Sequence, residues 1–230
     1  MAKLKTTVIP NQVFIGCPRK TVRPKYERLM LKMRKKYPLS FIIIGREEDQ
    51  DADDLLAVIK QKLLSSSYAV FDVTTGNANV SLEFGLAEAS GIERALYFCT
   101  HKAGSRQSAP DSAIIADLAG KRRVQYKQEK QLAGQLGKLC TSHNYTRRFE
   151  KFLKDNFRRA SKGRKKRNRA LALKIVHELD DQQARRRDDV VQAMLAEGYN
   201  AKEIDETFRR LNKSGLLVVT PGRYSAVEVR

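Results

Sequence analysis

Residues 68–99 read YAVFDVTTGNANVSLEFGLAEASGIERALYFC, and their pattern decides the fold. An apolar run over 68–73 predicts a buried strand, and a polar loop over 74–79 separates it from a helix over 80–90. Gly91 follows that helix, and the apolar run over 94–99 predicts a second strand. A strand, a helix and a strand in close succession indicate a parallel sheet.

The same alternation continues on both sides of this stretch. Apolar runs over 12–17 and 39–44 predict two earlier strands, and 121–126 predicts a later one. Helices are expected between the strands, over 24–38 and 53–64, and then over 128–157 with a break near 142–145. We therefore expect an α/β domain over residues 1–145: a Rossmann-like, flavodoxin-like parallel sheet with helices on both faces.

The last 61 residues, 170–230, predict a second and smaller domain. Three short amphipathic helices are expected over 171–179, 188–196 and 201–211. Two apolar runs then flank the turn sequence TPGR at 220–223, which indicates a β-hairpin. Three helices followed by a hairpin are typical of a winged-helix-like module.

A strongly basic segment, residues 146–169, joins the two predicted domains. It carries 12 Lys and Arg against 2 Asp and Glu, which is more than half of the net charge of +19. Phe149, Phe152, Leu153 and Phe157 recur at helical spacing, so we expect an amphipathic helix in its first half. We expect the second half, 160–169, to be a mobile charged linker.

This charge favours nucleic acid, DNA above all, as a partner. Phosphate contacts from Lys and Arg bind largely without regard to sequence and weaken as salt is added. The candidate contacts are Arg164, Lys165, Lys166, Arg167, Arg169, Arg209, Arg210 and Arg223. The alternatives are a solvated basic face and a C-terminal module that binds protein or dimerises, so a homo-oligomer stays open.

Several classes of protein are disfavoured by the composition. No run approaches the roughly 18 apolar residues of a membrane span, so we expect no membrane association and a cytoplasmic protein. The three cysteines are far apart, and no His or Cys spacing indicates a metal site.

Ligands of open parallel sheets bind beyond the carboxyl ends of the strands, where two segments stand out. The first is Gly16, Cys17, Pro18 and Arg19, directly after the first strand. The glycine permits close approach of the backbone, and Arg19 is suited to a phosphate. The alternative is a tight turn with solvated charges.

The second segment follows the strand over 68–73. Asp72 ends this strand, and Glu83 lies four residues after Asn79, so we expect these side chains around one crevice together with Asn77. Gly85 costs a helix interior about 1 kcal/mol relative to Ala, which predicts close approach of a backbone or ligand. The alternative is structural: Asp72 caps the loop, Asn79 caps the helix and Glu83 is solvated.

These residues carry a resemblance to a known family. The run from Asp72 through Asn77 and Asn79 to Glu83 and Gly85, after the opening VFIGCP, resembles the nucleoside 2-deoxyribosyltransferase and TIR-like superfamily over residues 12–126. The resemblance implies that Glu83 acts on the sugar C1′ of a nucleoside or of NAD. It also implies that Asp72 binds a sugar hydroxyl or assists the leaving base, and that Asn79 orients the ribose.

Two hypotheses follow about function. The first is a nucleoside deoxyribosyltransferase-like or TIR-like enzyme, an N-glycosidase, that acts on a nucleotide or nucleoside such as NAD without a further cofactor and associates with nucleic acid. The Asn-x-Asn approach to Glu83 favours the TIR-like branch. The second is a non-enzymatic DNA-binding regulator that senses a nucleotide.

Overall fold

The computed structural model describes residues 7–20, 22–44, 55–74, 77–100, 123–179, 185–220 and 226–230. The chain divides into two compact units. The α/β unit consists of Met1–Val8, Gln12–Lys35 and Phe41–Leu139. The C-terminal unit consists of Ile9–Asn11, Lys36–Ser40 and Cys140–Arg230. None of the described helices is long and apolar enough to cross a membrane.

Five strands form the sheet of the α/β unit. They are β1 (Ile9–Gly16), β2 (Ser40–Ile42), β3 (Ser66–Asp72), β4 (Arg94–Cys99) and β5 (Arg123–Tyr126). Their order is β2-β1-β3-β4-β5, and β4 pairs in parallel with both β3 and β5. The predicted α/β fold with a five-stranded parallel sheet is confirmed.

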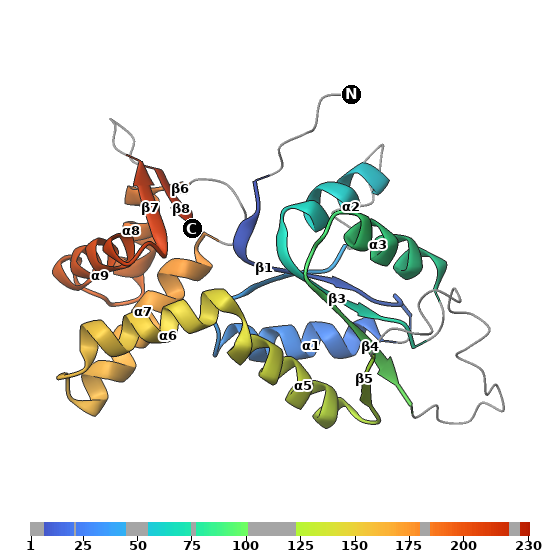
Figure 1. Ribbon diagram of the computed structural model, residues 1–230. Helices are drawn as coiled ribbons and strands as arrows, with labels where there is room; N and C mark the ends of the chain where they lie inside the picture. The colour runs from blue at the N-terminus through green and yellow to red at the C-terminus, as the bar shows by residue number, and fades with distance from the viewer. Residues whose placement is uncertain are drawn as a thin grey trace. The chain divides into compact units, whose positions relative to one another are not determined.

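Helices cover both faces of this sheet (Figure 1). α1 (Arg23–Arg34) and α5 (Glu129–Ser142) lie on one face, joined by an ion pair of Arg28 with Glu129 at 2.7 Å. α2 (Leu55–Leu64) and α3 (Ala78–Ala89) lie on the other. The chain thus leaves β1 toward one face and β3 toward the opposite face, which makes the ends of these neighbouring strands the switch point of the sheet.

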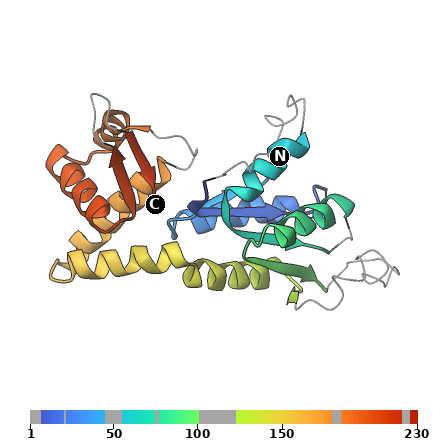
Figure 2. The same ribbon diagram turned by 45° about the horizontal axis from the view of Figure 1, so that its top comes forward.

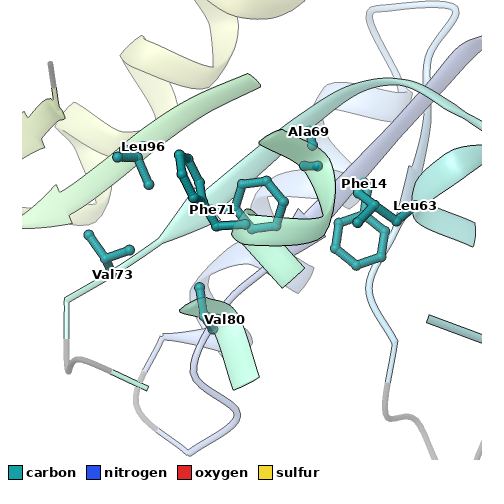
Figure 3. Close-up of a cluster of buried hydrophobic side chains, with 9 residues drawn as sticks. Phe14, Leu63, Ala69, Phe71, Val73, Val80 and Leu96 are labelled. Atoms are coloured by element: carbon teal, nitrogen blue, oxygen red, sulfur yellow. The ribbon is translucent and has the colours of Figure 1, made fainter. Parts of the chain in front are cut away.

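The apolar core under α3 fixes that helix on the sheet. Figure 3 shows Phe14 of β1 and Phe71 of β3 in this core. The ring centroid of Phe71 lies 6.0 Å from that of Phe14 and 5.5 Å from that of Phe84 of α3. Val80 and Leu63 complete the contact from α3 and α2. All five side chains are buried, and burying each one fully contributes about 1.5–3 kcal/mol.

The C-terminal unit consists of helices around a small antiparallel sheet. Its helices are α6 (Asn144–Phe157), α7 (Lys162–His177), α8 (Arg187–Ala196) and α9 (Ala201–Lys213). Its strands are β6 (Arg185–Arg186), β7 (Leu217–Thr220) and β8 (Ala226–Val229), in the order β6-β8-β7. The predicted pairing of the last two strands is confirmed. The sequence did not predict β6, because two arginines carry no apolar alternation.

The predicted linker over 160–169 is wrong from Lys162 onward, because these residues form the first half of α7. Ser161 begins the helix, and its hydroxyl accepts a hydrogen bond from the Arg164 backbone N–H at 3.4 Å. Arg and Lys are good helix formers, and the buried Leu171 and Ile175 anchor the same helix further on. The charged residues suit a solvated linker, but they also have a high helix propensity, and the prediction did not consider that propensity.

Candidate functional site

Gly16 and Asp72 are the last residues of β1 and β3, at the switch point of the sheet. Tyr126 ends the edge strand β5. The loop after β1 and the first turn of α3 start beside these ends. We call this region the carboxyl edge, and the two segments singled out from the sequence both reach it.

Asp72 is fully buried and accepts four hydrogen bonds. Its Oδ2 accepts from the Tyr26 hydroxyl at 3.0 Å and from the Tyr126 hydroxyl at 2.7 Å. Its Oδ1 accepts from the Thr74 backbone N–H at 3.1 Å and from the Thr74 hydroxyl. A carboxylate offers about four acceptor positions, so no position remains for a sugar hydroxyl or a leaving base.

These hydrogen bonds favour the structural alternative for Asp72 over the role that the resemblance implies. The carboxylate ties α1 and β5 to β3 and caps the loop after the strand, and Thr74 extends the tie to β4 by accepting from the Cys99 backbone N–H at 2.9 Å. Burial raises the pKa of Asp72, and its hydrogen bonds with Thr74 and the two tyrosines oppose that rise. This is a satisfied buried network that specifies the packing of the edge.

Glu83 is the contrasting carboxyl group of the edge. Its Oε2 is buried and has no hydrogen-bond partner among the described residues. Loss of hydration raises the pKa of Glu83 to about 7. The residue as a whole is only half-buried, so the group is held in a desolvated place without being sealed off. An unsatisfied buried carboxyl group costs free energy, which marks this position as one that packing alone does not explain.

Gly16 lies directly against this carboxyl group. A Cβ atom placed on Gly16 would overlap Oε2 of Glu83 and come within 2.7 Å of Cδ1 of Phe71. The predicted close approach at Gly16 is therefore present, and the atoms that approach belong to β3 and α3.

The two carboxyl groups come from opposite faces of the sheet, although both lie near enough to the Cys17 thiol to raise its pKa. Phe71 and Asp72 are consecutive in β3, so their side chains point to opposite faces of the sheet. Phe71 packs on Phe84 of α3, and Asp72 bonds to Tyr26 of α1. Glu83 belongs to the α3 face, and Asp72 to the α1 face. The helical spacing of Asn79 and Glu83 does not reveal this, because the face on which Asp72 lies is set by the alternation of side chains along β3.

The asparagines divide their roles differently from either interpretation of the sequence. Asn77 is the N-cap of α3, and its Oδ1 accepts from the backbone N–H groups of Asn79 and Val80 at 2.9 and 3.3 Å. Asn79 is exposed one turn before Glu83, on the same side of the helix. Asn79 is thus placed to contact a molecule that reaches Glu83.

Gly85 is not part of this arrangement. A Cβ atom on Gly85 would meet no atom within 4 Å, and the residue is exposed. Two positions along a helix turn it by roughly 200°, so Gly85 faces away from the side that carries Glu83. The close approach that its helical position predicted is absent among the described residues.

Gly16→Ala and Gly85→Ala are expected to change stability in opposite directions. The first substitution forces a methyl group into Glu83 and the Phe71 ring, which should lower the free energy of unfolding by about 1–3 kcal/mol. The second adds a methyl group in open space within a helix and should raise it by about 0.5–1 kcal/mol. Urea unfolding followed by circular dichroism measures both, and a Gly16→Ala protein as stable as the wild type would disprove the packing described.

The loop after β1 is a compact turn with little reactive chemistry. Burial, and then the nearby Asp72, raise the pKa of the Cys17 thiol to about 12, so it is a poor nucleophile at neutral pH. The buried Pro18 accepts two backbone hydrogen bonds, from Val22 and Arg23, both at 3.2 Å. Arg19 is exposed, which leaves it accessible to a phosphate.

Sequence reasoning missed the partners of Asp72. Tyr26 lies within the helix predicted over 24–38, but its hydroxyl contact crosses 46 positions of sequence, and that of Tyr126 crosses 54. A tyrosine in a buried stripe usually finds a partner for its hydroxyl, which was the available signal. The partner itself could not be known before the topology.

Glu83→Gln is expected to make the protein more stable, relative to the wild type, above pH 7 than at acidic pH. The folded state holds the proton of Glu83 up to about pH 7, against an ordinary value of 4.5, so wild-type stability falls as pH rises between these values. Glutamine does not titrate, so the stability of the Glu83→Gln protein does not fall over this pH range for this reason. The difference between the proteins should grow from pH 4 to pH 8 by on the order of 3 kcal/mol. Urea unfolding at both pH values measures it, and a constant difference would show a solvated carboxylate.

The basic residues singled out from the sequence fall into two groups. Arg167 holds Glu203 with two hydrogen bonds of 3.0 Å, Arg169 pairs with Glu150, and Glu206 pairs with both Arg209 and Arg210. Arg164, Lys165 and Lys166 are exposed and form no ion pair within the described part of the chain. Arg223 lies outside the described residues.

Among the described residues, no three His, Cys, Asp or Glu side chains come together as ligands. Within the described ranges, the carboxyl group without a partner at the carboxyl edge is that of Glu83, with Asn79 beside it.

Comparisons with known proteins add little to this description. No family model matches the chain, and no curated protein matches it. Among solved structures, the chain is similar to the "Crystal structure of conserved protein from Enterococcus faecalis V583". The identity is 13%, the match covers 56% of this chain and 98% of that chain, and the TM-score is 0.36. A likeness this distant assigns no function.

Proposed function

We propose that the α/β unit binds a nucleotide or nucleoside, NAD among the candidates, at the carboxyl edge and that Glu83 acts on its N-glycosidic bond. One observation carries the proposal: Glu83 presents a desolvated carboxyl group without a partner among the described residues, at the switch point where doubly wound sheets bind ligands. The resemblance to the nucleoside 2-deoxyribosyltransferase and TIR-like superfamily assigns the same residue.

The chemistry suits a single carboxylate. The bond between C1′ and the base nitrogen breaks, the base leaves with the electron pair, and the sugar becomes oxocarbenium-like. An ionised Glu83 stabilises that cation or bonds to C1′, and water then supplies hydroxide to C1′. The remaining proton of the water goes to the base of a nucleoside, or to solvent in the case of NAD, because nicotinamide leaves as a neutral molecule. A carboxylate without hydration interacts more strongly with such a cation than a solvated one does.

A second function, nucleotide sensing without turnover, is favoured by the state of Asp72. The four acceptor positions of Asp72 are filled by hydrogen bonds within the protein. Among the described residues, Glu83 therefore has no second carboxylate to assist it on its own face of the sheet. Such a site would bind a ligand and transmit its presence to the rest of the protein.

We further propose that the C-terminal unit is a winged-helix-like module and that the protein associates with DNA through its basic residues. A short strand after the first of three helices, paired with the last strand of the hairpin, is consistent with that module. The charge of +19 supports a polyanionic partner.

Incubation with NAD and a panel of nucleosides, with and without duplex DNA, separates the two functions. Chromatography of the products should show free base from at least one compound if the protein is an enzyme. Ligand binding by calorimetry without any free base would assign sensing. Neither binding nor release from any member of the panel would contradict both.

A further inference from the structure

Six basic residues surround the turn between α6 and α7. We call them the basic tip: Arg158, Arg159, Lys162, Arg164, Lys165 and Lys166. All six are exposed. Within the described ranges, none of the six forms an ion pair with an acidic side chain. The tip is therefore a concentrated positive charge without an ion pair in the described part of the chain, although Arg164 lies near enough to Glu203 to contribute to lowering the pKa of that carboxyl group.

The next arginines along the same helix are neutralised. Arg167 turns to Glu203 of α9 and also lies 5.0 Å from the centroid of the Tyr199 ring. Arg169 bonds to Glu150 of α6 at 2.8 Å. The structure thus separates the basic segment into an outward tip and an inward part that holds the C-terminal unit together.

The tip is the closed end of a helical hairpin. α6 and α7 run in opposite directions, as the contact of Arg169 with Glu150 requires, and the chain reverses between them (Figures 1 and 2). Successive residues of a helix are 100° apart, so the four cations in the first turns of α7 cover an arc of roughly 200°. Arg167 occupies the remaining side. Cations spread over such an arc can meet phosphates on both sides of a groove.

The position of these cations works against the helix that carries them. The N-terminus of a helix bears partial positive charge, and α7 has no acidic residue in its first turn. A sequence that breaks a local rule in this way commonly does so for function. A polyanion at the tip would relieve both the helix charge and the mutual repulsion of the side chains.

The surroundings of the tip favour nucleic acid over a membrane. Helices that lie on membranes insert apolar side chains beside their cations. The exposed large apolar side chains of the described residues are Val8, Leu31, Leu55, Leu56, Leu82 and Leu195. None belongs to α6 or α7, so the tip has charge without an apolar anchor.

α9, the helix that a winged-helix module would place in a groove, is a weaker candidate. Glu203 lies in its first turn and completes a capping box with Asn200, and Glu206 holds Arg209 and Arg210. Two of its four cations, Arg209 and Arg210, are therefore committed within the protein, and the exposed Lys202 and Lys213 lie near opposite ends of the helix.

We propose that the basic tip is the surface that grips the phosphate backbone of duplex DNA, and that α9 is not. The proposal rests on the DNA association proposed above and specifies where it occurs. It adds Arg158, Arg159 and Lys162 to the contacts and removes Arg167, Arg169, Arg209 and Arg210.

The first test compares two triple variants of the full chain. Arg164, Lys165 and Lys166 are replaced by Ala in one, and Lys202, Arg209 and Lys213, all exposed on α9, in the other. Both lose three charges. Titration on two unrelated duplexes over a salt series should give a slope of log K against log salt that is two to three units flatter for the tip variant. The α9 variant should change it by less than one unit.

A second pair of variants changes charge without changing the helix. Ser161→Asp and Ser161→Asn both keep a good N-cap, so both proteins should fold alike. Only Asp places a negative charge within the tip. If that charge cancels one phosphate contact, the salt slope of the Ser161→Asp protein is flatter by about 0.9. Its affinity for DNA at 0.1 M salt should then be about eightfold lower than that of the wild type, if the two proteins bind equally at 1 M salt. The Ser161→Asn protein should bind as the wild type does.

The outcomes separate this proposal from the one on which it rests. A wild-type protein without salt-dependent DNA binding would overturn both. The proposal about the basic tip alone would be overturned if the wild type binds DNA, the α9 variant has a flatter salt slope, and the tip variants keep the wild-type slope. Binding to phosphatidylserine vesicles as tight as to duplex DNA would overturn the choice of partner.

Discussion

Glu83→Gln is expected to lower the release of free base at least 100-fold while leaving the fold intact. The substitution keeps the shape of the side chain but removes the charge that stabilises the sugar cation or bonds to C1′. Loss of one such group typically costs roughly 10²–10⁴ in rate. The half-buried position on α3 accepts the amide without a change in packing, and the protein should become more stable above pH 7.

Glu88→Gln is the matched control for this prediction. Glu88 lies on the same helix, is exposed and pairs with Arg94, so the same chemical change is made away from the carboxyl edge. Chromatography of reactions with the substrate found in the panel measures both variants. Equal rates for the wild type and the Glu83→Gln protein would assign the chemistry to another residue.

Asp72→Ala is expected to be the most destabilising single substitution at the carboxyl edge. It leaves the buried hydroxyls of Tyr26, Thr74 and Tyr126 without their acceptor, and it opens a cavity beneath the sheet edge. Each unsatisfied buried donor costs about 1–3 kcal/mol, so the free energy of unfolding should fall by roughly 3–5 kcal/mol. That is a large part of the 5–15 kcal/mol typical of a domain.

Two milder variants show whether the hydrogen bonds are responsible. Asp72→Asn keeps one acceptor oxygen and nearly the same volume, and should lose about half as much. Tyr126→Phe removes one hydrogen bond and should lose about 1 kcal/mol. Denaturant unfolding of the three proteins tests the order, and an Asp72→Ala protein of wild-type stability would restore Asp72 as a residue available to a ligand.

Most of the fold could be predicted from the sequence because it depends on local pattern. The strand over 94–99 was predicted at its observed bounds, and the break between α5 and α6 falls at His143, within the predicted 142–145. Apolar runs and turn residues are sufficient for such elements. The prediction of a linker over 160–169 was wrong because the high charge of these residues indicates a solvated linker, whereas their helix propensity favours a helix.

The site could be predicted in position but not in detail. Which strand ends lie together follows from the α/β pattern, and Gly16 and Glu83 do lie together. The state of Asp72 depends on two tyrosines distant in sequence, and the face of Glu83 depends on how α3 packs on Phe71. The ion pair of Arg167 with Glu203 likewise joins two helices whose contact only the fold creates.

The most direct test of the central claim is the titration of the Glu83 carboxyl group by ¹³C NMR, assigned by the signal lost in Glu83→Gln. The protein alone should give a midpoint of about pH 7, and saturation with NAD should lower it, because the cationic nicotinamide riboside favours the ionised carboxylate. A midpoint near 4.5 that NAD does not move would show a solvated side chain outside the ligand site and would contradict the proposal.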